Sequence, residues 1–450
     1  MFIALGLLLT PSITHDVSIY LNPEIIAAEE NEFGIDPDDY TMSGPLQFYD
    51  NNGAEWNDFL GEGTNESPYV IEGLYFNMNS TDYDWEVTGS AVIVNHVTAY
   101  WIIRNCVFRG GNELVEDPDG DFIDVDGMAI DTMYAENGIV ENCTFIWLHT
   151  GLNLERSSNI IVRNNVFHGC TMEQERDVEL PGVSLHVDSY VCLGRAVFGY
   201  EGSHHLYILA NQIYNSSPGI LFSNVAYSQV EGNEIIGCET GIVIIDGSRM
   251  NNATENYVYG TLLVGISIHS STDSFLLNNS LILNYWGLWV DDASRNHTFA
   301  YNIMEDNGLA VFGLSPGDFT LAQIAPLGYG LRISDGTSTK MVWNDFVNDD
   351  ISARNDAEGN LYDYNYYSSY NGADENNDNI GDTPYDVEGD APTQDVHPRL
   401  KRLDYTPATN TTGTNTTSET SGVPMGIIMI AGLGGGISLI VIAFVIFKRR

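Results

Sequence analysis

The chain has 450 residues, 43% of them hydrophobic, and it carries 17 Lys and Arg against 62 Asp and Glu, a formal charge of −45. This charge disfavours a nucleic-acid partner, because phosphate binding needs a basic surface. The hydrophobic content is enough for a sizeable core, which argues against global disorder. The acidic balance is typical of a secreted or surface protein that meets cations.

The N-terminal residues 1–14 include FIALGLLL, which resembles the apolar core of a signal peptide without the basic residues that usually precede it. Residues 15–60 do not share the repeat described next. We therefore predict that they form an N-terminal cap.

A repeated phrase runs through residues 61–350: Asn-x-aliphatic, a short gap, then Gly-aliphatic-x-aliphatic. Its Asn residues recur every 22 or 23 positions within two runs, at Asn142 and Asn164 and then at Asn211, Asn233, Asn256, Asn279 and Asn302. Its glycines step by 21 to 24 residues, at Gly219, Gly241, Gly265, Gly287, Gly308 and Gly330. A gap of 47 residues separates Asn164 from Asn211, where 171–180 and 190–203 are interpreted as loop insertions.

This repeat predicts an all-β fold, a right-handed parallel β-helix of the pectin-lyase type with terminal caps. Leucine-rich repeats have a similar period but need Leu-rich phrases and a helical segment, whereas these apolar positions are mainly Ile, Val, Phe and Tyr. We expect eleven or twelve coils, each with about three short strands, stacked about 4.8 Å apart. The Asn side chains would bond to one another in a ladder, and the Gly residues would supply positive φ at sharp corners.

The five cysteines are too few and too odd in number for a disulfide framework. Cys106 and Cys143 each follow an Asn and are predicted to occupy equivalent inward positions in two coils. Burial as small hydrophobic residues is favoured over a disulfide or a metal site.

One stretch of the repeat could form an acidic face. Counted from the coil glycines, His269 is predicted to lie one coil below Asp291, about 5 Å away, and Asp246 two coils below Asp292. Carboxylates spaced in this way can divide acid and base roles in glycoside hydrolysis. The alternative, which the pattern favours, is that these polar residues only mark turns. Trp286 and Trp289 beside them could stack on a sugar ring or belong to the core.

Residues 351–404 are predicted to form an acidic C-terminal cap. Within them Asp374, Asn376, Asp378 and Asp382 fall at positions 1, 3, 5 and 9 of a calcium-type loop, with the Ile380 carbonyl at position 7. Asn379 could take the left-handed conformation usually given to Gly. The bidentate Glu of position 12 is missing, since Tyr385 stands there. A structural Ca²⁺ and a merely solvated acidic turn both remain open. Asp117, Asp119 and Asp121 form a weaker acidic loop of the same kind.

The stretches GEGTNESPYVIEGLYF (61–76), VTAYWIIRNCVFRGG (97–111) and GNLYDY…DENNDNIGDTPYD (359–386) resemble the NosD-type β-helix proteins. The resemblance covers residues 60–400 and implies a β-helix with carbohydrate-binding repeats, in a family described as periplasmic copper-binding proteins. Copper sites favour clusters of Met, Cys and His. Here the His residues are scattered apart from His204-His205, and Met128 and Met133 lack a His nearby in sequence, so copper is disfavoured.

The C-terminal end contains a candidate membrane-spanning segment. Residues 405–424 are a Thr/Asn-rich linker, and 425–447 (MGIIMIAGLGGGISLIVIAFVIF) hold no charge. At about 1.5 Å per residue this segment predicts one transmembrane helix. The basic tail 448–450 then predicts a cytoplasmic C-terminus and an extracellular N-terminal domain. Nine Asn-x-Ser/Thr sequons mildly support an extracellular glycoprotein.

Three functions remain open from the sequence. The leading interpretation is a membrane-anchored surface protein whose long face binds an extracellular polysaccharide or another surface polymer, without a clear catalytic site. The second is a polysaccharide hydrolase or lyase that uses the acidic face. The third is a structural or adhesive surface component.

Overall fold

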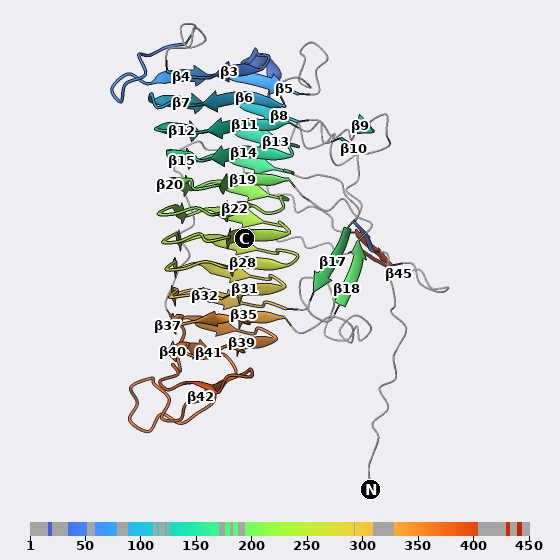
Figure 1. The fold of residues 1–450 in the computed structure, drawn as a ribbon. Helices are drawn as coiled ribbons and strands as arrows, with labels where there is room; N and C mark the ends of the chain where they lie inside the picture. The colour runs from blue at the N-terminus through green and yellow to red at the C-terminus, as the bar shows by residue number, and fades with distance from the viewer. Residues whose placement is uncertain are drawn as a thin grey trace, which may run out of the picture.

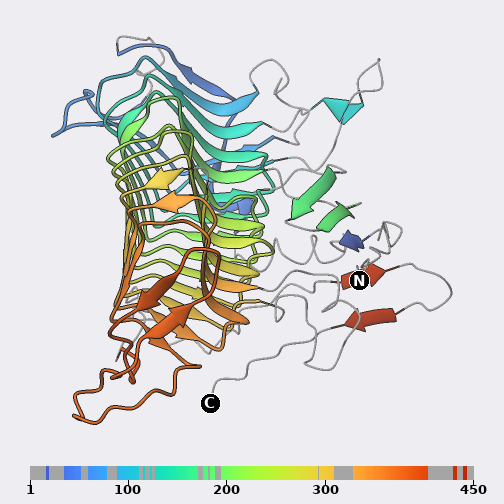
Figure 2. The same ribbon diagram turned by 60° about the horizontal axis from the view of Figure 1, so that its bottom comes forward.

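A computed structural model describes residues 17–19, 35–51, 59–78, 89–110, 115–116, 122–123, 127–170, 176–180, 183–187, 194–291, 293–308, 328–403, 429–432 and 439–442. The chain winds into a stack of coils whose strands form three long sheets (Figure 1). Figure 2 shows the stack from nearer its end, with the strands of successive coils lying one on another. The all-β, parallel β-helix prediction is therefore confirmed, and the described residues contain no α-helix, only the 3-10 turn η1 (Pro37–Asp39).

Each coil contributes one strand to each sheet in the order sheet 1, sheet 2, sheet 3. Sheet 1 has eleven strands, β3 (Leu46–Phe48), β6 (Ser90–Asn95), β11 (Met128–Met133), β14 (Thr150–Glu155), β19 (Arg195–Tyr200), β22 (Ile220–Ser223), β25 (Thr240–Ile245), β28 (Val264–His269), β31 (Trp286–Asp291), β35 (Tyr329–Ile333) and β39 (Ile351–Asn355). Its strands pair in parallel with their neighbours throughout, as expected for successive turns of one solenoid.

Sheet 2 has thirteen strands, β4 (Tyr69–Glu72), β7 (Trp101–Arg104), β12 (Gly138–Glu141), β15 (Ser158–Arg163), β20 (His204–Leu209), β23 (Gln229–Glu231), β26 (Asn252–Thr254), β29 (Phe275–Leu277), β33 (Thr298–Ala300), β37 (Lys340–Val342), β40 (Leu361–Asp363), β43 (Thr393–Asp395) and β42 (Tyr385–Val387). Sheet 3 has twelve strands, β2 (Thr41–Met42), β5 (Leu74–Asn77), β8 (Val107–Arg109), β13 (Thr144–Ile146), β16 (Val166–His168), β21 (Gln212–Tyr214), β24 (Glu234–Ile236), β27 (Tyr257–Tyr259), β30 (Ser280–Ile282), β34 (Ile303–Glu305), β38 (Asp345–Val347) and β41 (Tyr366–Tyr367). The stack thus includes parts of both ranges predicted as caps.

The core consists of side chains that stack on their equivalents in the next coil. Phe76, Phe108, Phe145 and Phe167 form one such column, with ring centroids 4.8, 4.9 and 4.4 Å apart. All four are fully buried, so the column excludes water while each ring contacts the next. Cys106 and Cys143 are also buried at equivalent positions, which confirms their predicted inward placement.

The predicted Asn ladder is present and includes Asn211 to Asn302 as expected, but its first member is Asn165 instead of Asn142. Nδ2 of each member donates to Oδ1 of the next at 2.9–3.0 Å, along Asn165, Asn211, Asn233, Asn256, Asn279, Asn302, Asn344 and Asn365. Asn142 and Asn164 are not members: they sit at the corner before it with φ of 53° and 54°. The inward positions that follow them are Cys143 and Asn165, because the corner residue must take the left-handed conformation before the chain turns inward.

The coil glycines are required for a different reason from the one predicted. Of the six coil glycines only Gly308 has the predicted positive φ, 128°; positive φ is absent at Gly219, Gly241, Gly265, Gly287 and Gly330. Instead, a Cβ at Gly241 would lie 2.5 Å from the carbonyl oxygen of Gly265, and a Cβ at Gly265 2.6 Å from that of Gly287. The glycines therefore permit the close approach of one coil's backbone to the next.

Four smaller sheets complete the described strands. They are the antiparallel trio β1 (Val17–Ile19), β44 (Met429–Gly432) and β45 (Leu439–Ile442), and the pairs β9 (Val115–Glu116) with β10 (Phe122–Ile123), β17 (Arg176–Leu180) with β18 (Val183–Val187), and β32 (Ser294–Arg295) with β36 (Gly336–Thr337).

The predicted transmembrane helix at 425–447 is not supported. The described part of this range consists of the two strands β44 and β45, and the rest lies outside the described residues. Within the part of the chain that the structure describes, no helix is long and apolar enough to span a bilayer. The signal-like segment 1–14, the linker 405–424, the tail 448–450 and the acidic loop at Asp117, Asp119 and Asp121 also lie outside the described residues.

Candidate functional site

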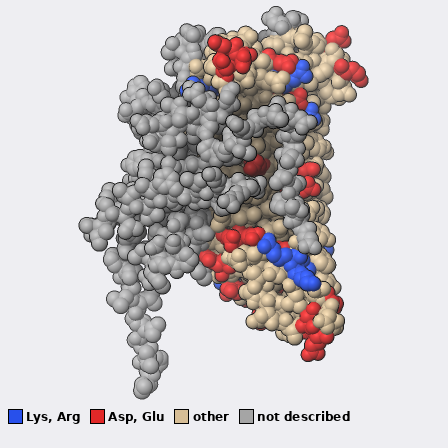
Figure 3. All heavy atoms as spheres, turned by 180° about the vertical axis from the view of Figure 1, so that it is seen from behind, with Lys and Arg blue, Asp and Glu red and all other residues tan. Residues whose placement is uncertain are grey.

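The outward side of sheet 1, here called the outer face, carries two clusters of polar and aromatic side chains. In several strands buried side chains alternate with half-buried ones, as in β11, where Ile130 and Thr132 point inward and Asp131 and Met133 outward. Because the strands are in register, outward residues of successive coils form rows along the stack. Figure 3 shows the opposite side from Figure 1, where the visible charged side chains gather mainly toward the two ends of the stack.

The predicted pairing of His269 with Asp291 is present. These residues are direct register partners on β28 and β31 of the outer face. The His269 ring is hydrogen-bonded to the Ser267 hydroxyl and stands edge-on to Trp289, with ring centroids 4.5 Å apart at 89°. The sequence therefore located this cluster correctly, although nothing in the geometry assigns it a reaction.

The other two predicted carboxylates, Asp246 and Asp292, are not shown to form a pair. Asp246 lies at the corner after β25 with φ of 57°, exposed, and its Oδ2 accepts a hydrogen bond of 2.8 Å from Ser223 Oγ. Asp292 lies outside the described residues, so its predicted relation to Asp246 stays a prediction.

The two tryptophans separate into core and surface. Trp286 is only 1% exposed and packs with Val264, Tyr285 and Tyr329, so its ring is not presented to a ligand. Trp289 is half-buried, and its indole Nε1 donates to Ser334 Oγ at 3.2 Å. Of the pair, Trp289 is the one that can contact a ligand on the outer face.

A second polar cluster, which was not predicted from the sequence, lies on β11, β14 and β19 of the same face. Asn153 Nδ2 donates to Asp131 Oδ1 at 2.8 Å and lies 3.4 Å from the Tyr200 hydroxyl. Tyr200 in turn donates to Glu155 Oε2 at 2.6 Å. We call these four residues the Asp131–Tyr200 cluster.

The two carboxyl groups of this cluster lie in different electrostatic environments. Burial raises the pKa of Asp131, and the Glu155 charge adds to the rise while the Asn153 hydrogen bond opposes it. Burial and the hydrogen bond to Glu155 raise the pKa of Tyr200 to about 12, so the phenol stays protonated. Glu155 is also ion-paired with Arg156 at 2.8 Å. One carboxyl group thus retains a proton more readily than an ordinary Asp, while the other faces a cation.

Aromatic and cationic side chains border the cluster. Phe198 stacks on Tyr200 with ring centroids 4.4 Å apart, and the Arg195 guanidinium lies 4.4 Å from the centre of the Phe198 ring. Burial lowers the pKa of Arg195. A ligand at the cluster would therefore meet hydrogen-bonding groups, an aromatic ring and a positive charge within three neighbouring coils.

The cluster escaped prediction because the repeat is interrupted at this point of the chain. Tyr200 follows Glu155 by 45 residues and lies within 190–203, which was interpreted as a loop insertion. That interpretation is wrong for residues 195–200, because they form strand β19 of sheet 1. The ladder step from Asn165 to Asn211 is 46 residues and would pair Glu155 with Glu201, whereas its register partner on sheet 1 is Tyr200, so the ladder spacing alone does not locate the cluster.

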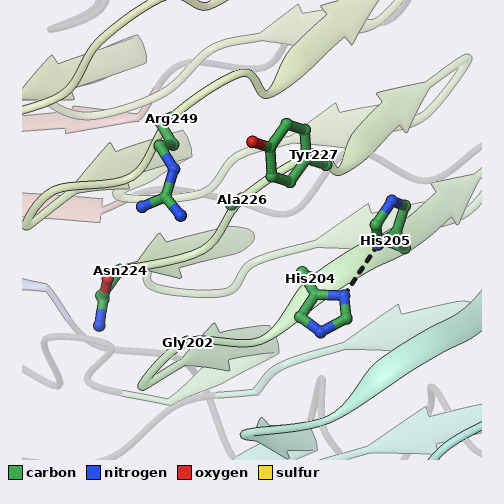
Figure 4. A pocket seen from close by; sticks show the side chains of 7 residues that line it. All are labelled: Gly202, His204, His205, Asn224, Ala226, Tyr227 and Arg249. Atoms are coloured by element: carbon green, nitrogen blue, oxygen red, sulfur yellow. Dashed lines mark hydrogen bonds between the residues drawn. The ribbon is translucent and has the colours of Figure 1, made fainter.

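A shallow pocket of about 250 Å³ lies at the corner between sheets 1 and 2. It is lined by Gly202, His204, His205, Asn224, Ala226, Tyr227 and Arg249. Figure 4 shows the Arg249 guanidinium projecting toward Ala226, with Tyr227 beside it and His204 on the far side of Ala226. We call this hollow the corner pocket.

The calcium-type loop has part of the predicted geometry. Asp374 accepts backbone N–H groups of Asp378 and Asn379 at 3.1 and 3.0 Å, and Asn379 has the expected left-handed conformation with φ of 70°. Asp382 accepts the N–H of Glu375 at 2.6 Å. Asn376 accepts the N–H of Asp378 and Asp378 that of Ile380. These bonds shape the loop, and whether it holds Ca²⁺ stays a prediction.

Among the described residues, no group of three or more His, Cys, Asp or Glu is placed to hold a metal ion. Cys106, Cys143, Cys170 and Cys238 are all buried among core side chains. His204 and His205 are hydrogen-bonded to each other instead.

Comparison with solved structures returned proteins of low similarity. A double mutant of the periplasmic alginate epimerase AlgG has 15% identity and a TM-score of 0.39, with 68% of this chain and 79% of that chain covered. A tailspike protein double mutant of E. coli bacteriophage HK620, in complex with a pentasaccharide, has 12% identity and a TM-score of 0.44, with 66% and 54% covered. DFA-IIIase from Arthrobacter chlorophenolicus A6 has 12% identity and a TM-score of 0.38, with 59% and 71% covered. The comparison with curated proteins gave no match.

Two family models match adjoining parts of the sequence. The right-handed β-helix region model matches residues 65–189. The model described as periplasmic copper-binding protein (NosD) matches residues 186–313. Together they cover most of the coils that form the three stacked sheets. The chain is a NosD-type right-handed β-helix repeat protein.

Proposed function

We propose that this protein binds an extracellular glycan along the outer face of sheet 1. The observation that carries the proposal is the Asp131–Tyr200 cluster beside Phe198, with its carboxyl, amide and phenol groups on three successive strands. Sugar hydroxyls need both donors and acceptors, and sugar rings pack on aromatic side chains. The coil spacing repeats along the face, which suits a ligand that is itself a repeating polymer.

Trp289 extends the proposed surface toward the other end of the stack. Its indole is held in place by Ser334 and by the edge-on His269 ring. A fixed ring loses little conformational entropy on binding, which favours its use as an anchor. The glycan would therefore span the strands from β11 to β31.

A glycan array probed with the full-length protein tests this proposal. Binding to one class of glycan is expected, and Trp289→Ala should weaken it by about tenfold, since an aromatic anchor contributes on the order of 1–2 kcal/mol. Phe275→Ala is the matched control, because Phe275 is an aromatic side chain 46% exposed on sheet 2 instead of sheet 1. The proposal fails if no glycan binds, or if both variants lose binding equally. Self-association without glycan binding would favour a structural or adhesive role.

The same cluster supports a second function, hydrolysis of the bound polysaccharide. The contacts through Asn153 and Tyr200 link the carboxyl groups of Asp131 and Glu155 on neighbouring strands, and glycoside hydrolases use such a pair of carboxyl groups. In this scheme Asp131 donates its proton to the glycosidic oxygen as the bond to the sugar carbon breaks. Glu155 accepts a proton from the water that attacks that carbon.

Release of reducing ends from the bound glycan distinguishes binding from hydrolysis. If the cluster is catalytic, Asp131→Asn should lower the rate by at least about a hundredfold. Asp291→Asn tests the alternative centre at His269 and Asp291 in the same assay. Glycan binding without any product from the wild-type protein would exclude hydrolysis and leave the binding function standing.

Attachment to a membrane through residues 425–447 is also proposed. It rests on the uncharged sequence of this segment and the basic residues 448–450 after it. Removal of residues 425–450 should move the protein from the membrane fraction to the soluble fraction. Recovery of the unaltered chain in the soluble fraction would contradict it.

A further inference from the structure

We propose that the corner pocket binds an anionic group, a sulfate, phosphate or carboxylate carried as a substituent of the glycan. The inference rests on the proposed function for the identity of its ligand. The pocket adjoins the outer face directly, because Tyr200 ends β19 and Gly202 begins the corner that leads to His204 on β20.

The hollow exists because the small residue Ala226 lies between two large side chains, His204 and Arg249. His204, Ala226 and Arg249 are register partners in three successive coils. The methyl group of Ala226 leaves free the volume that a long side chain would fill. Arg249 therefore stands above the hollow and His204 below it, as Figure 4 shows.

Arg249 has no ion pair among the residues that the structure describes. Its guanidinium instead lies over Tyr227, with Cζ 5.9 Å from the ring centre. The nearby Arg156 differs, because it pairs with both Glu155 and Glu201. An unpaired guanidinium keeps its hydrogen-bond donors for a ligand, and its planar fork suits the oxygens of a sulfate, phosphate or carboxylate.

The two histidines add a donor to the pocket. Their Nδ1 atoms lie 2.8 Å apart, so one ring donates and the other accepts. A neutral imidazole that accepts at Nδ1 must carry its own proton at Nε2, which leaves an N–H group for a ligand. His205 is further fixed by stacking on Tyr227, with ring centroids 5.7 Å apart.

Two carboxylates lie near the pocket, and both already have partners. Glu201 is ion-paired with Arg156. Asp246, in the coil after Asn224, accepts the Ser223 hydroxyl. The overall charge of −45 repels a polyanion at long range, but this repulsion is screened beyond about 8 Å in physiological salt. The pocket is therefore suited to a single anionic substituent, not to a densely charged polymer.

Isothermal titration of the full-length protein with sodium sulfate, sodium phosphate and sodium acetate, at ionic strength held constant with chloride, tests the pocket itself. Saturable binding of at least one anion is expected. Arg249→Gln should weaken it by about tenfold or more, since charge-assisted hydrogen bonds are lost. Ala226→Leu should abolish it by filling the hollow.

Arg295→Gln is the matched control. Arg295 is exposed and lies in the same register row, two coils beyond Arg249. Its removal should change the affinity by less than about twofold, because its charge is screened at that separation. Absence of saturable binding, or equal losses in the two arginine variants, would overturn the proposal. Circular dichroism of each variant verifies that the fold is retained.

A sulfated disaccharide and its unsulfated counterpart then identify the source of the anion. The sulfated form should bind more tightly than either inorganic sulfate or the unsulfated form, and Trp289→Ala should leave inorganic sulfate binding intact. Binding of inorganic anions with no gain from the sugar would overturn the glycan assignment. Binding of unsulfated glycan to the outer face without any anion binding would refute the pocket while the proposed function stands.

Discussion

Asp395 accepts two hydrogen bonds from Asn365, one from its backbone N–H and one from its side-chain Nδ2, both 2.9 Å long. The carboxylate thus occupies the place that the next Asn would take in the ladder. The final coil has no further coil to satisfy its inward polar groups, and the cap supplies this one acceptor.

Replacement of Asp395 should reveal how much this acceptor stabilises the end of the stack. Asp395→Ala leaves two buried donors of Asn365 unpaired, and we expect a loss of about 2–4 kcal/mol in the free energy of unfolding. Asp395→Asn keeps an acceptor oxygen and should cost less than about 1 kcal/mol. Denaturant unfolding of both variants measures the difference. Equal losses would mean that the charge, and not the acceptor, matters.

The buried His297 should make stability depend on pH. Its Nδ1 accepts the N–H of Ser274 at 3.2 Å, and burial lowers its pKa from 6.5 to about 4. The folded state therefore binds a proton less readily than the unfolded state. Its contribution to stability is complete above pH 6.5 and is lost as the pH falls toward 4, by on the order of 3 kcal/mol.

His297→Asn separates this titration from the hydrogen bond. Asn251 and Asn360 accept the same kind of bond at related corner positions, from Ser228 and Thr339. The variant should therefore fold, with a weaker dependence of unfolding free energy on pH between 6.5 and 4 than the wild-type protein. His168, whose pKa is also lowered to about 4 by burial, contributes to the dependence that remains. Identical pH profiles for wild type and variant would rule out His297 as a source.

The coil glycines and the corner glycines should respond differently to substitution. Gly265→Ala places a methyl group 2.6 Å from the Gly287 carbonyl oxygen, a backbone atom that cannot move aside alone. We expect a loss of about 1–3 kcal/mol. Gly260 has φ of 65°, and no heavy atom lies within 4 Å of the position that a Cβ would take. Gly260→Asn should therefore change the free energy of unfolding little, because Asn tolerates this conformation. Thermal unfolding of both variants tests the distinction, which would be refuted if Gly260→Asn were the more damaging.

Calcium binding at residues 374–382 remains a prediction with a direct test. Addition of Ca²⁺ should raise the melting temperature, and a chelator should reverse the rise. Asp378→Asn keeps the acceptor for the Ile380 N–H but removes one ligand charge, and should weaken Ca²⁺ binding on the order of tenfold. Glu375→Gln removes a charge from position 2 of the same loop, where no ligand is expected, and should have little effect. A melting temperature indifferent to Ca²⁺ would show that the loop is only a solvated turn.

The sequence was sufficient to predict the β-helix, its period and the Asn ladder, because stacking requires like residues at like intervals. The same period correctly predicted that His269 lies beside Asp291, its register partner in the next coil. Within uninterrupted coils, the spacing of two residues in the sequence is enough to predict whether they are neighbours in space.

Tertiary structure decided what spacing could not. It selected Asn165 over Asn164 for the ladder, since only the winding of the corner sets which of two adjacent Asn side chains points inward. It buried Trp286 and left Trp289 half-buried. Trp286 packs against Val264, Tyr285 and Tyr329, whereas Trp289 lies on the outer face. It also placed Tyr200 beside Glu155, 45 residues earlier in the chain, because residues 195–200 form a strand of sheet 1 where the sequence predicted a loop.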